Sequence, residues 1–186
     1  MTQYISRAIT VAGRSSLSYF NRGFHISLTN MAIQVGDKLP SVDLYENTPS
    51  NKVNIAEIAA GKKIIIFGVP GAFTPGCSKT HLPGYIEKAE ELKSKGIEEI
   101  ICVSVNDAFV MSAWGKDKQA DGKVRMLADT NAVFARSLDV AIDLPVLGGI
   151  RSKRFSMVVD NGIVKEVNIE PDNTGLSCSL ADRINV

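Results

Sequence analysis

The 186-residue sequence has no apolar run long enough to span a membrane, and it contains no internal repeats or low-complexity tracts. Its formal net charge is only +1, so nothing in it favours nucleic acid as a partner. It has three cysteines, which suit neither a secreted disulfide framework nor the spacing of a metal site. We therefore expect one globular domain with a short appendage, no membrane or nucleic-acid partner, no metal, and reduced intracellular thiols.

Acidic residues are absent from the first 31 positions, which hold three arginines and several Ser and Thr. This leaves 18 of the 21 basic residues to set against all 20 acidic ones, so the remainder is nearly neutral. An Arg-rich, acid-free segment with interspersed apolar residues is typical of mitochondrial transit peptides, and Arg22 precedes a segment that resembles a second-step cleavage octapeptide. We predict a transit peptide over 1–31 and a mature mitochondrial (matrix) domain over 32–186. A disordered tail is the alternative, and Met31 offers a second start site for a cytosolic form.

The chain is organised around the stretch IIIFGVPGAFTPGCSKT at 64–80. Residues 64–69 are apolar and rich in β-branched side chains, which predicts a strand buried on both faces. Four Pro and Gly residues then predict an irregular loop, and Cys77 falls at the start of the helix that follows. The unpaired N–H groups of a helix N-terminus favour a negative charge, so Cys77 is a candidate thiolate. We expect Pro83 to kink this helix and weaken its first turns.

The remaining pattern predicts alternating strands and helices that end in a hairpin. Asn161-Gly162 is a strong two-residue hairpin signal. The predicted strands are an edge strand or hairpin within 33–44 and strands at 100–105, 124–128, 154–160 and 163–169. The predicted helices are a short turn at 55–60, a helix over 107–118, one around 133–138 capped by Asp129, Thr130 or Asn131, and a last turn at 180–185. We expect surface connections at 139–152 and 171–179.

Pro70, Thr74 and Cys77 stand as P-x-x-x-T-x-x-C after a hydrophobic strand, which resembles the active-site signature of the peroxiredoxins. The strings VPGAFTPGCSKTHLPGY, RFSMVVDNGIVKEVNIEP and NTGLSCS resemble the peroxiredoxin-5 type, an atypical two-cysteine peroxiredoxin. The element order and the resemblance both imply an α/β, thioredoxin-like fold, a mixed sheet with helices on both faces. Thioredoxins carry C-x-x-C at this junction, whereas this chain has Thr74-Pro75-Gly76-Cys77, so a local dithiol exchange is excluded.

The resemblance implies a thioredoxin-dependent peroxidase that reduces hydrogen peroxide and organic hydroperoxides without a cofactor, as a monomer or non-covalent homodimer. Cys77 would be the nucleophile and become a sulfenic acid. Thr74 and Arg154 would donate hydrogen bonds to the sulfur and the peroxide, and Pro70 would shield the thiolate from water. The match at K-R-F-S-M favours Arg154 over its basic neighbours. Cys178, in a polar loop where a thiol has no packing role, would resolve the sulfenate as a disulfide.

Two residues receive structural assignments, and two other functions stay open. Cys102 lies in an apolar strand and is predicted to be core, and His81 is predicted to be structural or exposed. A one-cysteine or glutathione-dependent enzyme is the first alternative, and it requires Cys178 to be dispensable. A redox-sensing or binding protein is the second, and it requires slow, stoichiometric oxidation without turnover.

Overall fold

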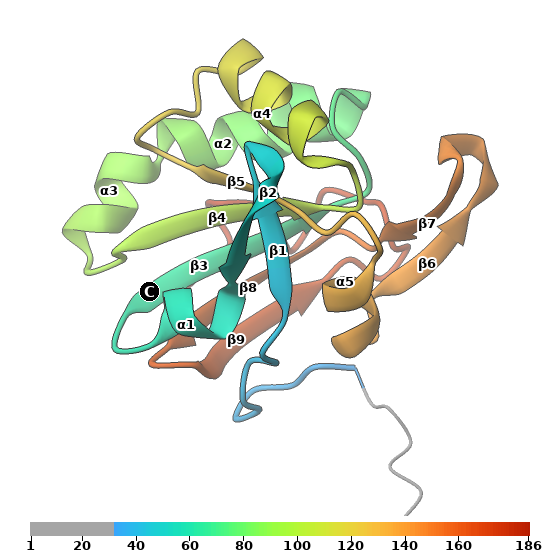
Figure 1. The fold of residues 1–186 in the computed structure, drawn as a ribbon. Helices are drawn as coiled ribbons and strands as arrows, with labels where there is room; N and C mark the ends of the chain where they lie inside the picture. Colours follow the sequence, from blue (N-terminus) through green and yellow to red (C-terminus); the bar gives the residue numbers. More distant parts are fainter. Residues whose placement is uncertain (1–31) are drawn as a thin grey trace, which may run out of the picture.

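A computed structural model describes residues 32–186 of the chain (Figure 1). The predicted transit peptide, 1–31, lies outside the described residues. Among residues 32–186, no helix is both long and apolar enough to cross a bilayer.

The described residues form a seven-stranded mixed sheet with the strand order β2-β1-β5-β4-β3-β8-β9. Strands β3, β4 and β5 are parallel, and the other neighbours in this sheet are antiparallel. The strands are β1 (Asp43–Glu46), β2 (Thr48–Asn54), β3 (Lys63–Val69), β4 (Glu99–Ser104), β5 (Arg125–Ala128), β8 (Phe155–Asp160) and β9 (Ile163–Ile169). A separate antiparallel pair consists of β6 (Ala141–Leu144) and β7 (Gly149–Ser152), joined by the 3₁₀ turn η2 (Pro145–Leu147).

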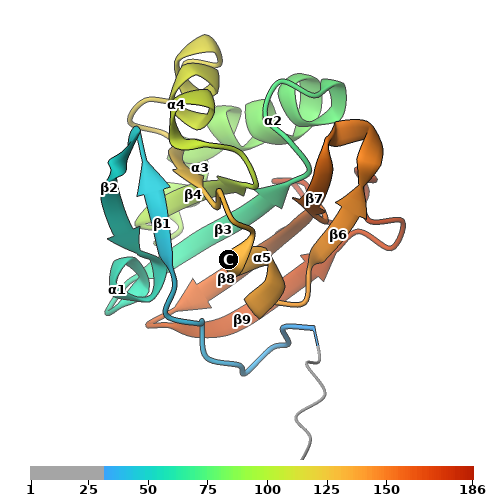
Figure 2. The same ribbon diagram turned by 45° about the vertical axis from the view of Figure 1, so that its right-hand side comes forward.

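Helices cover both faces of the large sheet (Figures 1 and 2). One face carries the π-helical turn η1 (Cys77–His81) and the helices α2 (Leu82–Glu87), α3 (Ala89–Ser94) and α4 (Ala108–Asp117). The opposite face carries α1 (Ile55–Ala59) and α5 (Val133–Ser137). The predicted thioredoxin-like architecture is confirmed.

Strand β3 is central because its side chains fill both cores. Ile64 and Ile66 belong to the apolar cluster beneath α1 and α5, whereas Ile65 and Phe67 belong to the cluster beneath α2, α3 and α4. Successive side chains of a strand point to opposite faces, so a continuous apolar run is what a strand with two covered faces requires. The carboxyl end of β3 therefore holds the following loop on a rigid support.

The hairpin prediction at Asn161-Gly162 is confirmed. Both residues have positive φ, 46° and 76°, and they join β8 to β9. These angles suit a two-residue turn whose twist matches the flanking strands. Side chains alternate along β8 as well, because Phe155 and Met157 pack in the core beneath α1 and α5 while Val158 packs in the opposite core.

Three segments differ from their predictions. The strand expected within 33–44 begins only at Asp43 and pairs with β2, a polar, largely exposed strand that shows no apolar alternation because it lies at the sheet edge. The surface connection expected at 139–152 is the β6–β7 hairpin, which Arg151 ties to the sheet by donating to the Val105 carbonyl at 2.9 Å. At 180–185, where a helical turn is expected, the structure has one hydrogen-bonded turn and no helix, and the Arg183 N–H closes it by donating to the Leu180 carbonyl.

The cap of α5 differs from the prediction in its geometry. Ala132, with φ of 54°, precedes the helix and offers no side-chain cap. Asp129 reaches past it instead, and its carboxylate accepts from the N–H groups of Phe134 and Ala135 at 3.1 and 2.9 Å. One of the three predicted capping residues therefore stabilises this helix, although it stands three positions before the N-cap residue Ala132.

The helix that follows Cys77 is irregular at the predicted position. Its first turn is π-helical, with the Leu82 N–H donating to the Cys77 carbonyl five residues earlier. Pro83 follows at the second position of α2, directly after η1, and has no N–H to donate to a carbonyl of that turn. A second break at Lys88, with φ −90° and ψ 1°, separates α2 from α3 and was not expected from the sequence.

Gly68 in β3 provides a test of how tightly the core packs beside the site. A Cβ atom at this position would lie 2.1 Å from Cε1 of Phe155, so Gly68→Ala should lower the free energy of unfolding by about 1–3 kcal/mol. Urea unfolding followed by circular dichroism measures this change. Gly84→Ala is the matched control, because its Cβ would lie 4.0 Å from Ala181 and the change should be neutral or stabilise α2. Equal stability of Gly68→Ala and wild type would contradict the packing.

Candidate active site

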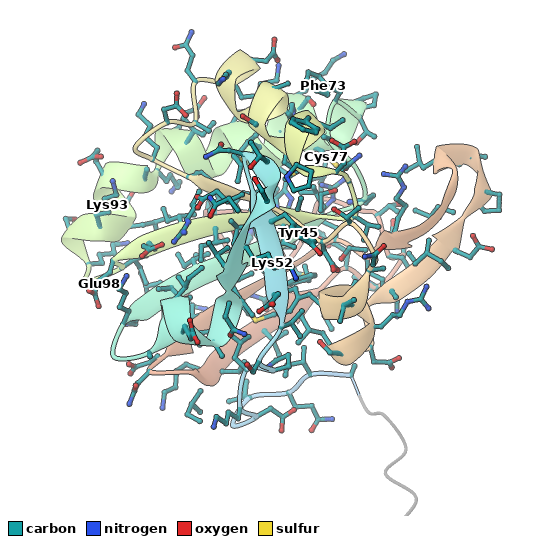
Figure 3. All side chains as sticks on the ribbon, in the orientation of Figure 1. Tyr45, Lys52, Phe73, Cys77, Lys93 and Glu98 are labelled. Carbon is teal, nitrogen blue, oxygen red and sulfur yellow. The ribbon has the colours of Figure 1, made fainter. Side chains whose placement is uncertain are left out.

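Cys77 is held at the carboxyl end of β3 by an ordered loop. The Ala72 N–H donates to the Asn106 side chain at 3.0 Å, and the Ser78 N–H donates to the Thr74 carbonyl at 2.9 Å. The Cys77 side chain is buried, and it begins the turn η1 as the sequence predicts. Figure 3 shows Cys77 and Phe73 at the same end of the molecule, away from Lys93 and Glu98. Phe73 is 53 % exposed and has φ of 60°, a backbone conformation that residues other than Gly rarely adopt.

Arg154 contacts the sulfur of Cys77. Its Nη1 lies 3.3 Å from Cys77 Sγ, and the residue is only 3 % exposed, although it stands just before β8 rather than within it. Among residues 32–186, no carboxylate lies within ion-pairing distance of Arg154. A buried guanidinium in this position stabilises negative charge on a neighbouring sulfur or oxygen atom.

The guanidinium is fixed from two further sides. Arg154 Nε donates to the Thr174 carbonyl at 3.1 Å, and Nη1 lies 3.2 Å from Nδ1 of His81. Nδ1 must accept from the cation, so the His81 proton is on Nε2, which donates to the Ser179 carbonyl at 3.0 Å. Burial and the nearby charge of Arg154 lower the pKa of His81 to about 3, against a raising effect of the Ser179 bond, so the ring is neutral. The sequence predicted a structural or exposed His81, and the structure has it buried, beside Arg154, which the sequence did not predict.

Thr74 and Pro70 both lie near Cys77, and Thr74 differs from its predicted contacts. The Thr74 hydroxyl donates to the Gly71 carbonyl at 2.9 Å rather than to the Cys77 sulfur. Nor does it cap the helix, because the capping position belongs to Gly76 and has no side-chain bond. The hydroxyl oxygen keeps lone pairs that can accept an O–H proton. Pro70 is buried directly after β3, as expected for a residue that excludes water.

The other two cysteines occupy different environments, and all three thiols are free. Cys102 is fully buried in β4, and burial raises the pKa of its thiol well above the usual value, in keeping with its predicted place in the core. Cys178 is partly exposed in the loop after β9, where burial and the charge of Glu170 raise its thiol pKa. Within residues 32–186, no three His, Cys, Asp or Glu side chains gather as they would around a metal ion.

Sequence reasoning did not find Glu170 or Tyr85. Glu170 is 1 % exposed and accepts hydrogen bonds from the loop that carries Cys178, and the Tyr85 hydroxyl donates to the Ser179 carbonyl at 2.9 Å. A carboxylate directly after the strand 163–169, followed by Pro171 and by the serines that flank Cys178, was the available signal for Glu170. Tyr85 had no signal beyond its apolar helical spacing.

Known proteins resemble this chain in both sequence and fold. Residues 34–183 match the Redoxin family. Peroxiredoxin-2E, chloroplastic, from Arabidopsis thaliana is 44 % identical over 177 residues, which cover 91 % of this chain and 76 % of that relative. The chain belongs to the peroxiredoxin family. Membership of this family makes the chain a thiol peroxidase. The buried Cys77 is the candidate for the reacting thiol.

Two solved peroxiredoxin structures are close in fold as well as in sequence. Reduced Prx3 from Vibrio vulnificus in complex with H₂O₂ has a TM-score of 0.76 and 45 % identity, covering 81 % of this chain and 96 % of that chain. Peroxiredoxin 5 from the worm Alvinella pompejana has a TM-score of 0.71 and 42 % identity, covering 76 % of this chain and 92 % of its own.

Arg154→Lys tests whether the guanidinium beside Cys77 accelerates oxidation. Lysine keeps the charge but cannot bond the sulfur, His81 and the Thr174 carbonyl together, so the second-order rate constant for hydrogen peroxide should fall about 100-fold. Stopped-flow oxidation of the reduced enzyme measures that constant. Arg151→Lys is the control, since Arg151 donates to the carbonyls of Val105 and Leu147 rather than to Cys77. An equal loss in both variants would rule out a special role for Arg154.

Proposed function

We propose that this peroxiredoxin is of the peroxiredoxin-5 type, with Cys77 as peroxidatic nucleophile and Cys178 as resolving cysteine. The observation that carries the proposal is the buried contact between Arg154 Nη1 and Cys77 Sγ at 3.3 Å. A positive charge and a free thiol, both removed from bulk water, form the pair needed to cleave a peroxide bond.

In the first step the Cys77 thiolate attacks one peroxide oxygen, and the O–O bond breaks. The sulfur becomes a sulfenic acid, and the other oxygen takes up a proton and leaves as water or an alcohol. Arg154 stabilises the charge that develops on the departing oxygen. The Thr74 hydroxyl accepts the O–H of the incoming peroxide, and the N–H of Gly76 or Cys77 completes the set of donors. Pro70 shields the reacting sulfur from water.

In the second step the Cys178 thiolate attacks the Cys77 sulfur. The S–O bond of the sulfenic acid breaks, the hydroxyl leaves as water with one proton, and an intramolecular disulfide forms. Because Cys77 is buried within η1, this turn must unwind before the two sulfur atoms can meet. The π-helical turn and Pro83 support this, because both weaken the helix where Cys77 would leave it.

Thioredoxin is the proposed reductant of the Cys77–Cys178 disulfide, and hydrogen peroxide and organic hydroperoxides are the proposed substrates. The acid-free, Arg-rich segment 1–31 supports a mitochondrial precursor with the mature domain at 32–186. The Arabidopsis relative carries a chloroplastic designation, and the organelle proposed for this chain is instead the mitochondrion. The proposed oligomeric state is a monomer or a non-covalent homodimer.

Peptide mapping tests both cysteine assignments at once. One equivalent of hydrogen peroxide should remove two hydrogen atoms from the wild-type mass within seconds and link Cys77 to Cys178. Cys178→Ser should instead trap a sulfenic acid on Cys77. If Cys178→Ser turns over normally with thioredoxin, the enzyme works with one cysteine. If Cys77 stays reduced, the nucleophile is wrong, and a redox-sensing or binding role takes its place.

Pro83→Ala tests the unwinding step. Alanine at this position restores an N–H donor and strengthens the helix, so disulfide formation should slow several-fold while sulfenate formation keeps its rate. Trp114, the sole tryptophan, reports the unwinding because its Nε1 donates to Ser78 Oγ in η1 at 3.0 Å. Two phases of its stopped-flow fluorescence separate the two rates. An unchanged or faster second phase in Pro83→Ala would show that helix opening does not limit the resolving step.

A further inference from the structure

The loop 171–179, called the Cys178 loop below, is held around Cys178 by two sets of hydrogen bonds. One set of bonds comes from η1 and α2, the elements proposed to move. The other comes from Glu170 at the end of β9, an element of the seven-stranded sheet.

The side that would move holds the loop through a single carbonyl. The Ser179 oxygen accepts from His81 Nε2 at 3.0 Å and from the Tyr85 hydroxyl at 2.9 Å. His81 is the last residue of η1, and Tyr85 lies in α2. When η1 unwinds to release Cys77, His81 leaves its place, and the bond from Nε2 is lost with it.

The Glu170 side is independent of η1. Glu170 Oε1 accepts from three consecutive backbone N–H groups, those of Ser177, Cys178 and Ser179, at 2.8, 3.0 and 3.0 Å. The hydroxyl of Ser179 donates to the same oxygen at 2.7 Å, and the hydroxyl of Ser177 donates to Oε2 at 2.5 Å. One carboxylate thus fixes the backbone on both sides of Cys178.

The hydrogen bonds to Glu170 are strong as well as numerous. Burial alone would raise the pKa of Glu170, but the hydrogen bonds from Ser177 and Ser179 outweigh it and lower the pKa to about 2. Hydrogen bonds to an ionised, buried acceptor are roughly twice as strong as neutral ones. The Cys178 loop therefore stays in place while the π-helical turn opposite it opens.

We propose that Glu170 is the positioning residue of the resolving step and holds Cys178 as a fixed target to which Cys77 travels. The gain is one of effective concentration, since a tethered, oriented thiol meets the sulfenic sulfur more often than one on a free loop. This inference rests on the proposed role of Cys178. It adds that Glu170 acts on the second step, because its carboxylate bonds the backbone at residues 177–179. The part of the loop that contacts the Arg154 guanidinium is Thr174, and the N–H groups of Thr174 and Gly175 are held by Asp172 instead.

The charge of Glu170 also has an opposite effect, which the test must separate from positioning. It adds to burial in raising the pKa of the Cys178 thiol, which by itself slows the attack. Glu170→Asp keeps the charge but withdraws the carboxylate from the three N–H groups. Glu170→Gln removes the charge at nearly the same shape, so it serves as the second variant if Glu170→Asp does not fold.

The experiment follows the two fluorescence phases of Trp114 in the full chain after mixing with hydrogen peroxide. Glu170→Asp should slow the second phase about tenfold and leave the first phase unchanged. It should also increase the yield of sulfinic acid on Cys77 at high peroxide, because the sulfenic acid then waits longer. Hydrogen exchange at the amides of Ser177, Cys178 and Ser179 should accelerate in the same variant.

Glu166→Asp is the matched control, because Glu166 lies in the same strand and bonds Asn168 and Asn185 instead of the Cys178 loop. A second phase in Glu170→Asp, or in Glu170→Gln if only that variant folds, as fast as in Glu166→Asp would overturn the inference, and a faster one would make Glu170 a brake. If the wild type forms no Cys77–Cys178 disulfide by peptide mapping, the proposed function fails instead. If the wild type does form this disulfide and the Glu170 variant leaves the second phase unchanged, the role of Cys178 stands and only the role of Glu170 fails.

Discussion

The burial of the Arg154 guanidinium beside the Cys77 sulfur is the constraint on which the rest of the site depends. A charge 3 % exposed without an ion-pair partner among residues 32–186 requires that its donors be satisfied by other groups. The sulfur, a neutral His81 and the Thr174 carbonyl meet this need. Two of these partners lie in η1 and the third lies in the Cys178 loop, so this one side chain, which stands just before β8, holds the two segments together.

The same arrangement divides the site into a stiff part and a weak part. Strand β3 has apolar neighbours on both faces, and the end of β9 carries Glu170 with its five hydrogen bonds. The helix after Cys77, by contrast, starts with a π turn, continues through Pro83 and breaks again at Lys88. A segment with poorly formed helical bonds opens at lower free energy than the sheet beneath it. Cys77 therefore lies in the segment that opens at the lowest free energy.

The fold also explains why a single thiol at this junction leads to a different chemistry from a dithiol. A second cysteine within the same turn would exchange disulfides locally, whereas Cys77 has only Arg154 as its polar side-chain partner in the described residues. In the proposed cycle, the oxidised form of Cys77 therefore reacts with a thiol from another element. The Cys178 loop carries such a thiol. It is joined to η1, the turn that begins with Cys77, by the hydrogen bond from His81 Nε2 to the Ser179 carbonyl.

The sequence by itself determined the central strand, the hairpin at Asn161-Gly162 and the position of Cys77, because these follow from local patterns: apolar runs, a turn that needs positive φ, and loop-forming Pro and Gly. It predicted neither the polar edge strand β2 nor the β6–β7 hairpin, whose pairing depends on partners rather than on local pattern. Residue by residue it named Arg154 only through a family resemblance, and it gave Thr74 a contact that the Gly71 carbonyl takes instead. Only the tertiary structure decided that His81 accepts from Arg154 and that Glu170 holds the Cys178 loop. Buried hydrogen bonds between residues seven to ninety-eight positions apart depend on how the elements pack, which no local periodicity encodes.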